Sequence, residues 1–280
     1  MATVLDLRDG VDPLHELTSR YLELVARPDR EHCPLGAYFI ASDSEFAPLA
    51  RFVERTVFRE RFGNDDDTMN SEYDPYEAAS YFGVVIDHRA AEPVGASRRI
   101  VPNSYGLKTL HDVGRIPEWN VSLEEIRAHH GDVRLERTSD VATIAVRREW
   151  ASNTGSVASL ALFRVMILGA LMSNVRHEVF ALDLQAGEKT LLAHMHFERL
   201  CDLPAIEYLG SGATAPYIGI VEKGMQLYRE GDPVARMLLD GEGLGGEVSF
   251  PPIDLDTIGD VGSAVDLEPQ GERVGTGVNI

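Results

Sequence analysis

The sequence predicts an α/β fold of the α+β type, in which helices pack on a mixed sheet. Apolar residues follow the period of a helix in some segments and that of a strand in others, in the order β–α–β–β–β–α–β–α–β–β. Two successive strands surround a polar bend, which favours an antiparallel hairpin. The strand–helix–strand run in the second half is compatible with a crossover unit.

The first elements follow from apolar spacing and from helix start and stop signals. A helix is expected over residues 11–27, where Arg27–Pro28–Asp29 ends it. Leu35–Ala41 is short and apolar and is predicted to be a strand. Ser42 and Glu45 have the spacing of a capping box, so a second helix is expected from there to about Phe62.

The middle of the chain is more polar. Residues 63–75 (GNDDDTMNSEYDP) are predicted to be a loop, followed by two hairpin strands, Tyr81–Asp87 and Pro93–Val101. Residues 103–135 are expected to be irregular, apart from one short helix that Ser122 caps and to which Glu125 reaches back.

The second half alternates strands and helices. The expected elements, in order, are a strand at Ser139–Arg147, an apolar helix at Gly155–Asn174, a strand at Val179–Leu184, a helix at Glu188–Leu200, strands at Ala205–Leu209 and Tyr217–Val221, and a helix at 223–239. The helix at Gly155–Asn174 is apolar almost all round, which predicts burial on more than one side.

Composition and charge bound the functional class. The 280 residues carry a net charge of −19, which disfavours a nucleic-acid partner. Two cysteines fit a reducing cytoplasm better than a disulfide framework. The longest apolar run, Val157–Met172, contains Ser159 and Arg164, so no membrane span is expected. The sequence makes no prediction about oligomeric state.

We expect three parts along the chain. Residues 1–34 are an N-terminal helical extension, and residues 35–240 are the main domain. Residues 241–280 are an acidic, Gly-rich tail, which that composition predicts to be solvated and mobile.

Four segments carry a resemblance to a known family: RTVFRERFG (55–63), SEYDPYEAASYF (71–82), VGASRRIVP (94–102) and VRREWASNTGSVASLALFRVM (146–166). In order and spacing, the chain resembles GNAT acyltransferases. Within them it looks most like the branch of acyl-homoserine-lactone synthases and long-chain N-acyl amino acid synthases. The resemblance covers roughly residues 35–225. It implies a mostly antiparallel sheet with helices on both faces and a cofactor strand that splays from its neighbour.

Several positions depart from the pattern of that branch. Glu54 stands where the family has its first Arg, Asn64 replaces a Trp, and Ser71 replaces an Asp. Near the cofactor strand, Asp140 matches the family's acid but Thr143 replaces its Arg. These changes disfavour a homoserine-lactone product and leave acyl transfer to another amine.

The resemblance implies where an acyl thioester would bind. Ile144, Ala145 and Val146 would face the pantetheine, and the loop from Arg147 to Gly155 would meet phosphate, with Ser156 opening the following helix. Arg147 or Arg148 would add positive charge. The alternative is that Gly155 only starts a core helix. No tightly bound cofactor is expected, since acyl-CoA or an acyl-phosphopantetheine would be a co-substrate.

The donor carrier is either coenzyme A or an acyl carrier protein. Carrier proteins are acidic, so docking on this acidic chain would need a local basic patch. The candidate residues are Arg147, Arg148, Arg164, Lys223 and Arg229.

Asp140 is the first candidate for the general base that removes a proton from the amine, directly or through a water. Glu136 is the reserve candidate, because it lies on the same face as Asp140 if the strand extends that far. The alternative for Asp140 is a carboxylate at the end of a strand in solvent.

Tyr73 and Asp74 are candidates for binding the ammonium group of a small-molecule amine acceptor, although Asp74–Pro75 is also an ordinary turn dipeptide. Arg99 would bind an acceptor carboxylate or form a structural ion pair, with Asp74 or Asp140 as partners. The adjacent Arg98 points to the other face of the strand and is expected to be solvated. No metal site is expected, because His194 and His196 have the wrong spacing for one helix face.

Two functional classes follow. The first is an N-acyltransferase that moves an acyl group from an acyl thioester to the amine of an amino acid or small metabolite. The alternative is a non-catalytic GNAT-like domain that senses an acyl thioester or docks a partner, which the departures from the family pattern support.

Overall fold

The computed structural model describes residues 12–25, 33–153, 155–173, 175–185, 197–240 and 248–249. All described strands belong to one mixed sheet with the order β6-β8-β5-β4-β3-β2-β1-β9, and β7 pairs with β8 off this path. Their bounds are β1 Leu35–Ala41, β2 Ser80–Asp87, β3 Glu92–Ile100, β4 Thr138–Val146, β5 His177–Asp183, β6 Phe197–Arg199, β7 Ile206–Tyr208, β8 Ser211–Ile220 and β9 Val248–Ser249.

Most neighbouring strands run antiparallel, which confirms the predicted sheet. The parallel pairs are β4 with β5 and β1 with β9. The hairpin of β2 and β3 forms as expected, and β4 and β5 are joined through the predicted apolar helix. The sheet is therefore a run of antiparallel pairs interrupted by one parallel pair near its centre, with a second parallel pair at one edge.

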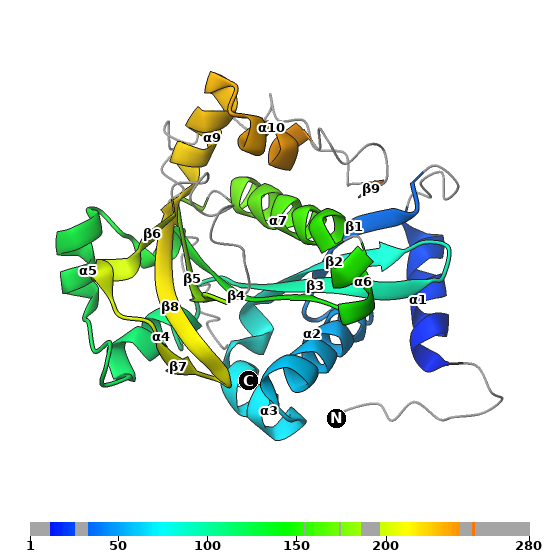
Figure 1. Ribbon diagram of the computed structural model, residues 1–280, viewed down its shortest axis with the longest axis horizontal. Helices are drawn as coiled ribbons and strands as arrows, with labels where there is room; N and C mark the ends of the chain where they lie inside the picture. Colours follow the sequence, from blue (N-terminus) through cyan, green and yellow to red (C-terminus); the bar gives the residue numbers. More distant parts are fainter. Residues whose placement is uncertain are drawn as a thin grey trace, which may run out of the picture.

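Helices cover both faces of this sheet (Figure 1). The described helices are α1 Pro13–Leu24, α2 Ala47–Phe62, α3 Asp66–Tyr73, α4 Lys108–Arg115, α5 Leu123–His130, α6 Arg148–Asn153, α7 Gly155–Met172, α9 Val221–Glu230 and α10 Pro233–Asp240. Short 3₁₀ turns lie at η1 Asp74–Ala79, η2 Leu135–Arg137 and η3 Leu200–Asp202. Helix α7 lies on one face and α2 on the opposite face, with α9 and α10 outside α7 (Figure 1).

The apolar helix α7 is buried on several sides, as its composition predicts. Ala158, Ala161 and Leu162 pack with residues of β1, β2 and β3, whereas Leu168 and Leu171 pack towards α9 and α10. A helix with apolar residues all round is stable only when it is covered in this way. It therefore forms the centre of its layer.

Three short helices lie in segments predicted to be loops. α3 and η1 occupy the end of the polar segment 63–75 and the residues after it, α4 lies in the segment predicted to be irregular, and α6 lies in the predicted phosphate loop. The polar residues of α3 act as helix signals: the Asp65 side chain accepts a hydrogen bond from the Thr68 backbone N–H at 2.9 Å. A polar composition alone was therefore the wrong criterion for predicting that these segments are loops.

The two expected capping boxes have opposite outcomes. Ser122 and Glu125 form the reciprocal pair at the start of α5, as predicted. The box at Ser42 and Glu45 is wrong, because α2 begins only at Ala47 and Glu45 instead forms an ion pair with Arg20 at 2.6 Å. Residues 42–46, which the pattern assigned to the first turn of the helix, instead form a non-helical turn before it.

Several expectations for the C-terminal half are corrected. The helix expected at 223–239 is split into α9 and α10 at Gly231, whose φ of 83° ends the first helix. Of the helix expected at Glu188–Leu200, residues 188–196 lie outside the described residues, and Phe197–Arg199 is a strand. The expected tail lies outside the described residues except for Val248 and Ser249, which pair with β1.

Candidate active site

The central parallel pair opens after three residues. β4 pairs with β5 at Thr138, Ser139 and Asp140, opposite His177, Glu178 and Val179. From Val141 to Val146, β4 is paired with β3 alone among the described residues, whereas β5 continues along β8. This opening agrees with the splayed strand that the resemblance to GNAT acyltransferases implies.

A β-bulge lies in β4 just after the opening. Arg98 of β3 pairs with Thr143 and Arg99 pairs with Val141, so Ala142 is the additional residue. Because of this extra residue, the side chains of Asp140 and Thr143 point to the same face of the sheet, although they are three positions apart. Simple alternation would place them on opposite faces.

Asp140 is fully buried at the start of α4. Its carboxylate accepts hydrogen bonds from the backbone N–H of Thr109 and, at 2.9 Å, from the Thr109 hydroxyl. Burial raises the pKa of Asp140 to about 7, although these two bonds and Lys108 act in the opposite direction. Asp140 is therefore an enclosed carboxyl that titrates near neutral pH. It is not the solvent-exposed carboxylate at a strand end that the sequence offered as the alternative.

Glu136 does not lie on the strand with Asp140. β4 begins at Thr138, and Glu136 is an exposed residue of the turn η2. The condition for placing it on the same face as Asp140 is therefore not met.

Arg98 is at the centre of a buried ion-pair network, which corrects its expected solvation. Its guanidinium forms a bidentate contact with Glu54 of α2, at 2.7 and 3.0 Å, and a further ion pair with Glu77 at 2.7 Å. Thr143 donates its hydroxyl to the same Glu54 carboxylate at 2.6 Å. Although burial lowers the pKa of Arg98, the carboxylates of Glu54 and Glu77 outweigh it and raise the pKa above its usual value.

Two of the departures from the family pattern thus contact each other. Glu54 and Thr143, each standing where the family has an Arg, share a hydrogen bond and are both buried. Arg98 supplies the positive charge between α2 and the sheet. Glu54, Thr143 and Arg98 therefore form one buried network.

Tyr73 lies between two cations beside this network. Its ring centre is 4.8 Å from the Arg98 guanidinium carbon and 5.4 Å from Lys108 Nζ. Burial raises the pKa of the Tyr73 hydroxyl. Asp74 is exposed at the end of α3, so the two residues predicted to bind an ammonium group differ sharply in environment.

Lys108 links α4 to the same region. Its ammonium forms ion pairs of 2.7 Å with Glu72 and with Asp112, and it donates to the Tyr208 hydroxyl at 2.7 Å. Burial lowers the pKa of Lys108, but Tyr73, Tyr208 and Asp112 together raise it by more, so the net shift of the pKa is upward. Lys108 is thus a buried cation next to Thr109, the partner of Asp140.

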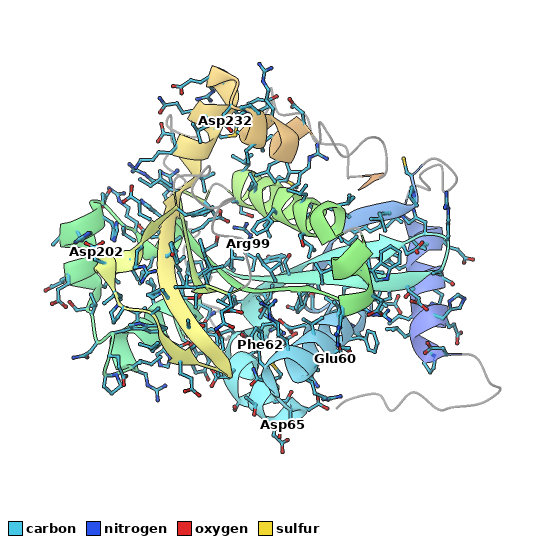
Figure 2. The ribbon with its side chains drawn as sticks, in the orientation of Figure 1. Glu60, Phe62, Asp65, Arg99, Asp202 and Asp232 are labelled. Carbon is cyan, nitrogen blue, oxygen red and sulfur yellow. The ribbon has the colours of Figure 1, made fainter. Side chains whose placement is uncertain are left out.

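Arg99 points to the opposite face, between the sheet and α7 (Figure 2). It donates to the Ser139 hydroxyl at 2.5 Å and to the Met166 carbonyl, and it lies 2.6 Å from Glu178 as an ion pair. Its partner is therefore Glu178 and neither Asp74 nor Asp140.

The residues predicted to hold the thioester donor line the open half of β4 and the joint after it. Ile144 and Val146 contact apolar residues on the α7 side, and Ala145 packs in the core under α2. Arg147 forms ion pairs with Glu92 at 3.3 Å and with Glu149 at 2.5 Å, whereas Arg148 is exposed at the start of α6. Gly155 and Ser156 begin α7, as the sequence predicts.

Sequence reasoning missed five polar residues of this region: Glu54 as a buried partner, Arg98, Lys108, Thr109 and Glu178. One signal was present, because Lys108 and Asp112 are spaced i, i+4 as in a helical ion pair. The roles of the other four residues depend on which strands and helices pack together, and short spacing patterns in the sequence carry no information about that packing.

In the ranges that the structure describes, no three His, Cys, Asp or Glu side chains gather as metal ligands. Within the same ranges, no helix has both the length and the apolarity to cross a membrane.

Comparisons with known proteins give structural neighbours only. No protein-family model matches the chain, and a search of curated proteins finds no significant match. Among solved structures, FeeM, an N-acyl amino acid synthase from uncultured soil microbes, has a TM-score of 0.49 at 14% identity, covering 69% of this chain and 94% of its own.

Two acyl-homoserine-lactone synthases are similar to the same extent. LasI has a TM-score of 0.48 at 14% identity and covers 74% of this chain and 95% of its own. BjaI, a CoA-dependent enzyme solved with S-adenosylmethionine and isopentyl-CoA, has a TM-score of 0.45 at 12% identity, covering 81% of this chain and 97% of its own. These are the two classes of synthase that the sequence motifs resemble.

Proposed function

We propose that this chain is an N-acyltransferase, which moves an acyl group from an acyl thioester to the amine of an amino acid or small metabolite. The observation that carries the proposal is the opening of β4 from β5 after Asp140. An open strand presents backbone N–H groups along an edge, and such groups hold a pantetheine and stabilise the oxyanion of a tetrahedral intermediate. The sequence resemblance to acyltransferases supports the same assignment.

The reaction needs a base for the amine proton. We assign this role to Asp140, the carboxyl next to the opening, with a pKa of about 7 that suits proton transfer near neutral pH. Because its oxygens already accept from Thr109, the proton would pass through a water or after a small shift of α4. Glu136 remains only a reserve candidate, since it lies outside the strand.

The donor would lie along Ile144, Ala145 and Val146. Arg147, Arg148 and the start of α7 at Gly155 and Ser156 would meet its phosphate groups. The donor is an acyl-CoA or an acyl-phosphopantetheine on a carrier protein, and it is consumed as a co-substrate.

The acceptor would approach from the side of α2, α3 and α4. Tyr73 and Asp74 are the proposed contacts of its ammonium group, with the buried Arg98–Glu54 pair fixing the wall behind Tyr73. Arg99 is committed to Glu178 and to the Met166 carbonyl, which favours its structural role over the binding of an acceptor carboxylate.

A second candidate function is a binding module that senses an acyl thioester without turnover. The enclosure of Asp140 favours it, because a carboxyl with no exposed surface and both oxygens hydrogen-bonded is also a stable structural element. In this case the opening of β4 would still bind a donor.

One experiment separates the two functions. Release of free thiol is measured from panels of acyl-CoA and acyl carrier proteins of different chain length, against pooled amino acids and amines. Release that requires an amine supports the enzyme. Donor binding by calorimetry without release under any combination supports the sensor, and neither binding nor release contradicts both.

A further inference from the structure

The cations on the acceptor side of the sheet, the side of α2, α3 and α4, are already paired with carboxylates. Arg98 and Lys108 are buried there, and each forms two ion pairs of 2.7 Å. Their partners are Glu54, Glu77, Glu72 and Asp112. Arg51 is a third cation of this network and shares Glu77 with Arg98.

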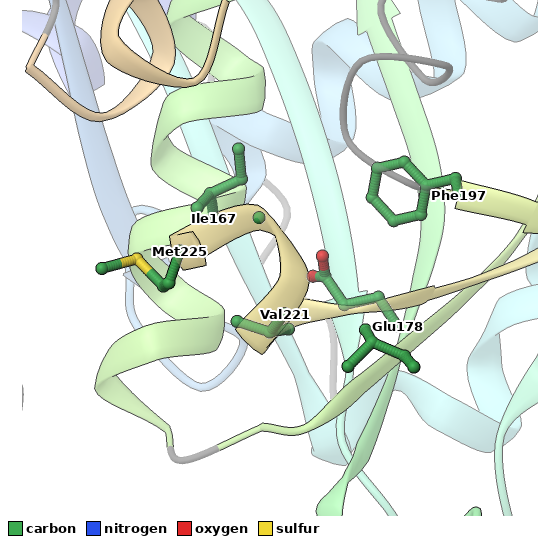
Figure 3. A pocket seen from close by; sticks show the side chains of 7 residues that line it. Ile167, Glu178, Phe197, Val221 and Met225 are labelled. Atoms are coloured by element: carbon green, nitrogen blue, oxygen red, sulfur yellow. The ribbon is translucent and has the colours of Figure 1, made fainter. Parts of the chain in front are cut away.

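The other cations of α2, β3 and α4 in the described part of the chain are paired as well. Each has a carboxylate within 3.8 Å, except Arg115, which is exposed at the far end of α4. Arg99, on the opposite face, is held by Glu178. Apolar side chains that include Val221 and Met225 line the small pocket beside Glu178 (Figure 3), which has room for about one water molecule. An acceptor carboxylate therefore finds no unpaired cation on these elements near the opening of β4.

Negative charge exceeds positive charge on the acceptor side. Four carboxylates share three cations in the network, and Asp140 adds a fifth carboxyl that has no ion pair with a described residue. A carboxylate on the acceptor would add one more negative charge to a buried region, which is unfavourable without a cation to match it. An ammonium group has the opposite effect, because it compensates the excess.

Two buried tyrosines beside this network have unused hydroxyl groups. Tyr73 and Tyr76 are each 4% exposed, and neither hydroxyl forms a hydrogen bond with a described residue. Neither oxygen is one of the enclosed polar atoms that lack a partner, so both remain accessible. Burial raises the pKa of the Tyr76 hydroxyl, and Asp112 and Asp140 raise it further, which places this hydroxyl within electrostatic reach of Asp140. A buried tyrosine hydroxyl usually has a partner, and its oxygen accepts well from an ammonium N–H.

We propose that the acceptor is a cationic amine without an α-carboxylate, such as the decarboxylated counterpart of an amino acid, bound through its nitrogen by the Tyr73 and Tyr76 hydroxyls next to Asp140. The inference rests on the proposed acyltransferase function and narrows its acceptor class. The side chains of Glu72 and Glu77 are 31% and 28% exposed, so the amine enters where α3 meets η1. The ammonium loses one proton to solvent. As its nitrogen forms the amide bond, a second proton passes to Asp140, the C–S bond breaks, and the departing thiolate takes up a proton.

The test compares acceptors that differ at the carboxylate. Thiol release from the panel of acyl-CoA and acyl carrier proteins is measured with phenethylamine, phenylalanine and phenylalaninamide, and with the corresponding sets for leucine and alanine, at equal concentrations of unprotonated amine. We expect kcat/KM for the amines and amides to be at least tenfold above that for the amino acids. Equal or higher values for the amino acids would overturn the inference and leave the acyltransferase function intact.

The absence of release with every acceptor would contradict the acyltransferase function instead. Calorimetry with the same sets then decides the class of ligand on this side. Binding of the amines at least tenfold tighter than that of the amino acids would support the inference, and any other result would contradict it.

Three variants sharpen the test. Glu72→Gln leaves Lys108 with one carboxylate and should reduce the preference for amines at least threefold. Glu60→Gln removes the same charge from an exposed position of α2 and should leave the preference unchanged. Tyr76→Phe keeps the ring and should raise KM for phenethylamine at least threefold with little change in kcat. An unchanged preference in Glu72→Gln or an unchanged KM in Tyr76→Phe would contradict the assigned site. If Glu72→Gln does not fold, the comparison of acceptors with the unaltered protein still decides.

Discussion

At the scale of single residues, the two adjacent arginines of β3 organise both faces of the sheet. Arg98 points towards α2 and pairs with Glu54 and Glu77, whereas Arg99 points towards α7 and pairs with Glu178. Both are buried, because helices cover both faces. A buried arginine is retained only with carboxylates to match it, which explains why each face also contains a buried glutamate.

The Arg98–Glu54 pair is expected to be costly to break from one side. Glu54→Leu should lower the free energy of unfolding by about 3–5 kcal/mol, because it leaves Arg98 with a buried excess charge. Glu54→Leu with Arg98→Met should be much less destabilising than the sum of the two single changes. Urea denaturation of the four proteins measures the coupling; additive effects would contradict a direct buried interaction.

Thr143→Val is the matched control, because it removes one hydrogen bond to Glu54 and keeps the charges. We expect it to cost about 1 kcal/mol of unfolding free energy. A loss as large as that of Glu54→Leu would place the energy in the packing of β4 instead of the ion pair.

The raised pKa of Asp140 predicts how stability depends on pH. The folded protein holds the proton up to about pH 7, whereas an unfolded chain releases it near pH 4. Between these values the folded state binds more protons, so the contribution of Asp140 to stability decreases as the pH rises. Asp140→Asn should remove this part of the pH dependence; parallel urea-derived stability profiles of the two proteins between pH 4 and 8 would contradict it.

Asp140→Asn also tests the proposed base. Thiol release should fall at least tenfold, and the wild-type rate should rise with pH through about 7, because the base acts when deprotonated. Ser122→Ala, which changes only the N-cap of α5, should leave the rate unchanged. Unaltered kinetics in Asp140→Asn would remove Asp140 from this role.

At the scale of elements, the β-bulge decides what the site contains. The sequence predicts the strand that carries Asp140 and its neighbours, but its alternation rule places Asp140 and Thr143 on opposite faces. The extra residue Ala142 brings them to one face, where Thr143 donates to Glu54 and Asp140 accepts from Thr109. A one-residue irregularity depends on the pairing with β3, so no pattern within β4 alone could predict it.

Long elements with a regular apolar period were predictable, and short polar ones were not. α7 and the β2–β3 hairpin lie close to their expected bounds, and α2 ends at the expected residue although it begins later than expected. α4 was missed because it is short and polar, yet its first residues are Lys108 and Thr109, and Thr109 donates two hydrogen bonds to Asp140. Arg98 was misjudged because its expected solvation took no account of α2, which covers that face of β3. The partners in the candidate site thus come from tertiary contacts that spacing does not contain.

The close contact between α7 and the sheet gives a prediction for one glycine. A Cβ added at Gly83 of β2 would lie 2.6 Å from Ser97 Oγ and 2.8 Å from Val165 Cγ1 of α7. Both are short, buried side chains, so Gly83→Ala should push α7 from the sheet and cost about 1–3 kcal/mol of unfolding free energy.

The control for Gly83→Ala is Gly212→Ala on β8, where the nearest atom to the added Cβ is Gln185 Nε2 at 3.5 Å. That distance is an ordinary contact, so we expect little change in the urea midpoint. Similar midpoints for the two variants would contradict a tight α7–sheet contact.

At the scale of the whole molecule, charge limits how a donor reaches the site. The chain carries a net charge of −19, and three of the five cations considered for a basic patch are already engaged. Arg147 pairs with Glu92 and Glu149, Arg164 donates to the Leu239 carbonyl at 2.9 Å, and Lys223 pairs with Glu198 at 3.2 Å. An acidic partner therefore meets a predominantly negative surface.

If an acyl carrier protein is the donor, its encounter with this chain should be slowed at low ionic strength. The screening length falls from about 30 Å at 0.01 M salt to about 10 Å at 0.1 M, which weakens the repulsion between two acidic proteins. We therefore expect kcat/KM for an acyl carrier protein to rise severalfold over this range. The value of kcat at saturating donor should stay nearly constant, because it does not include the encounter. A kcat/KM that falls with salt would contradict this account and would indicate that the arginines leave their present partners to form a basic docking surface.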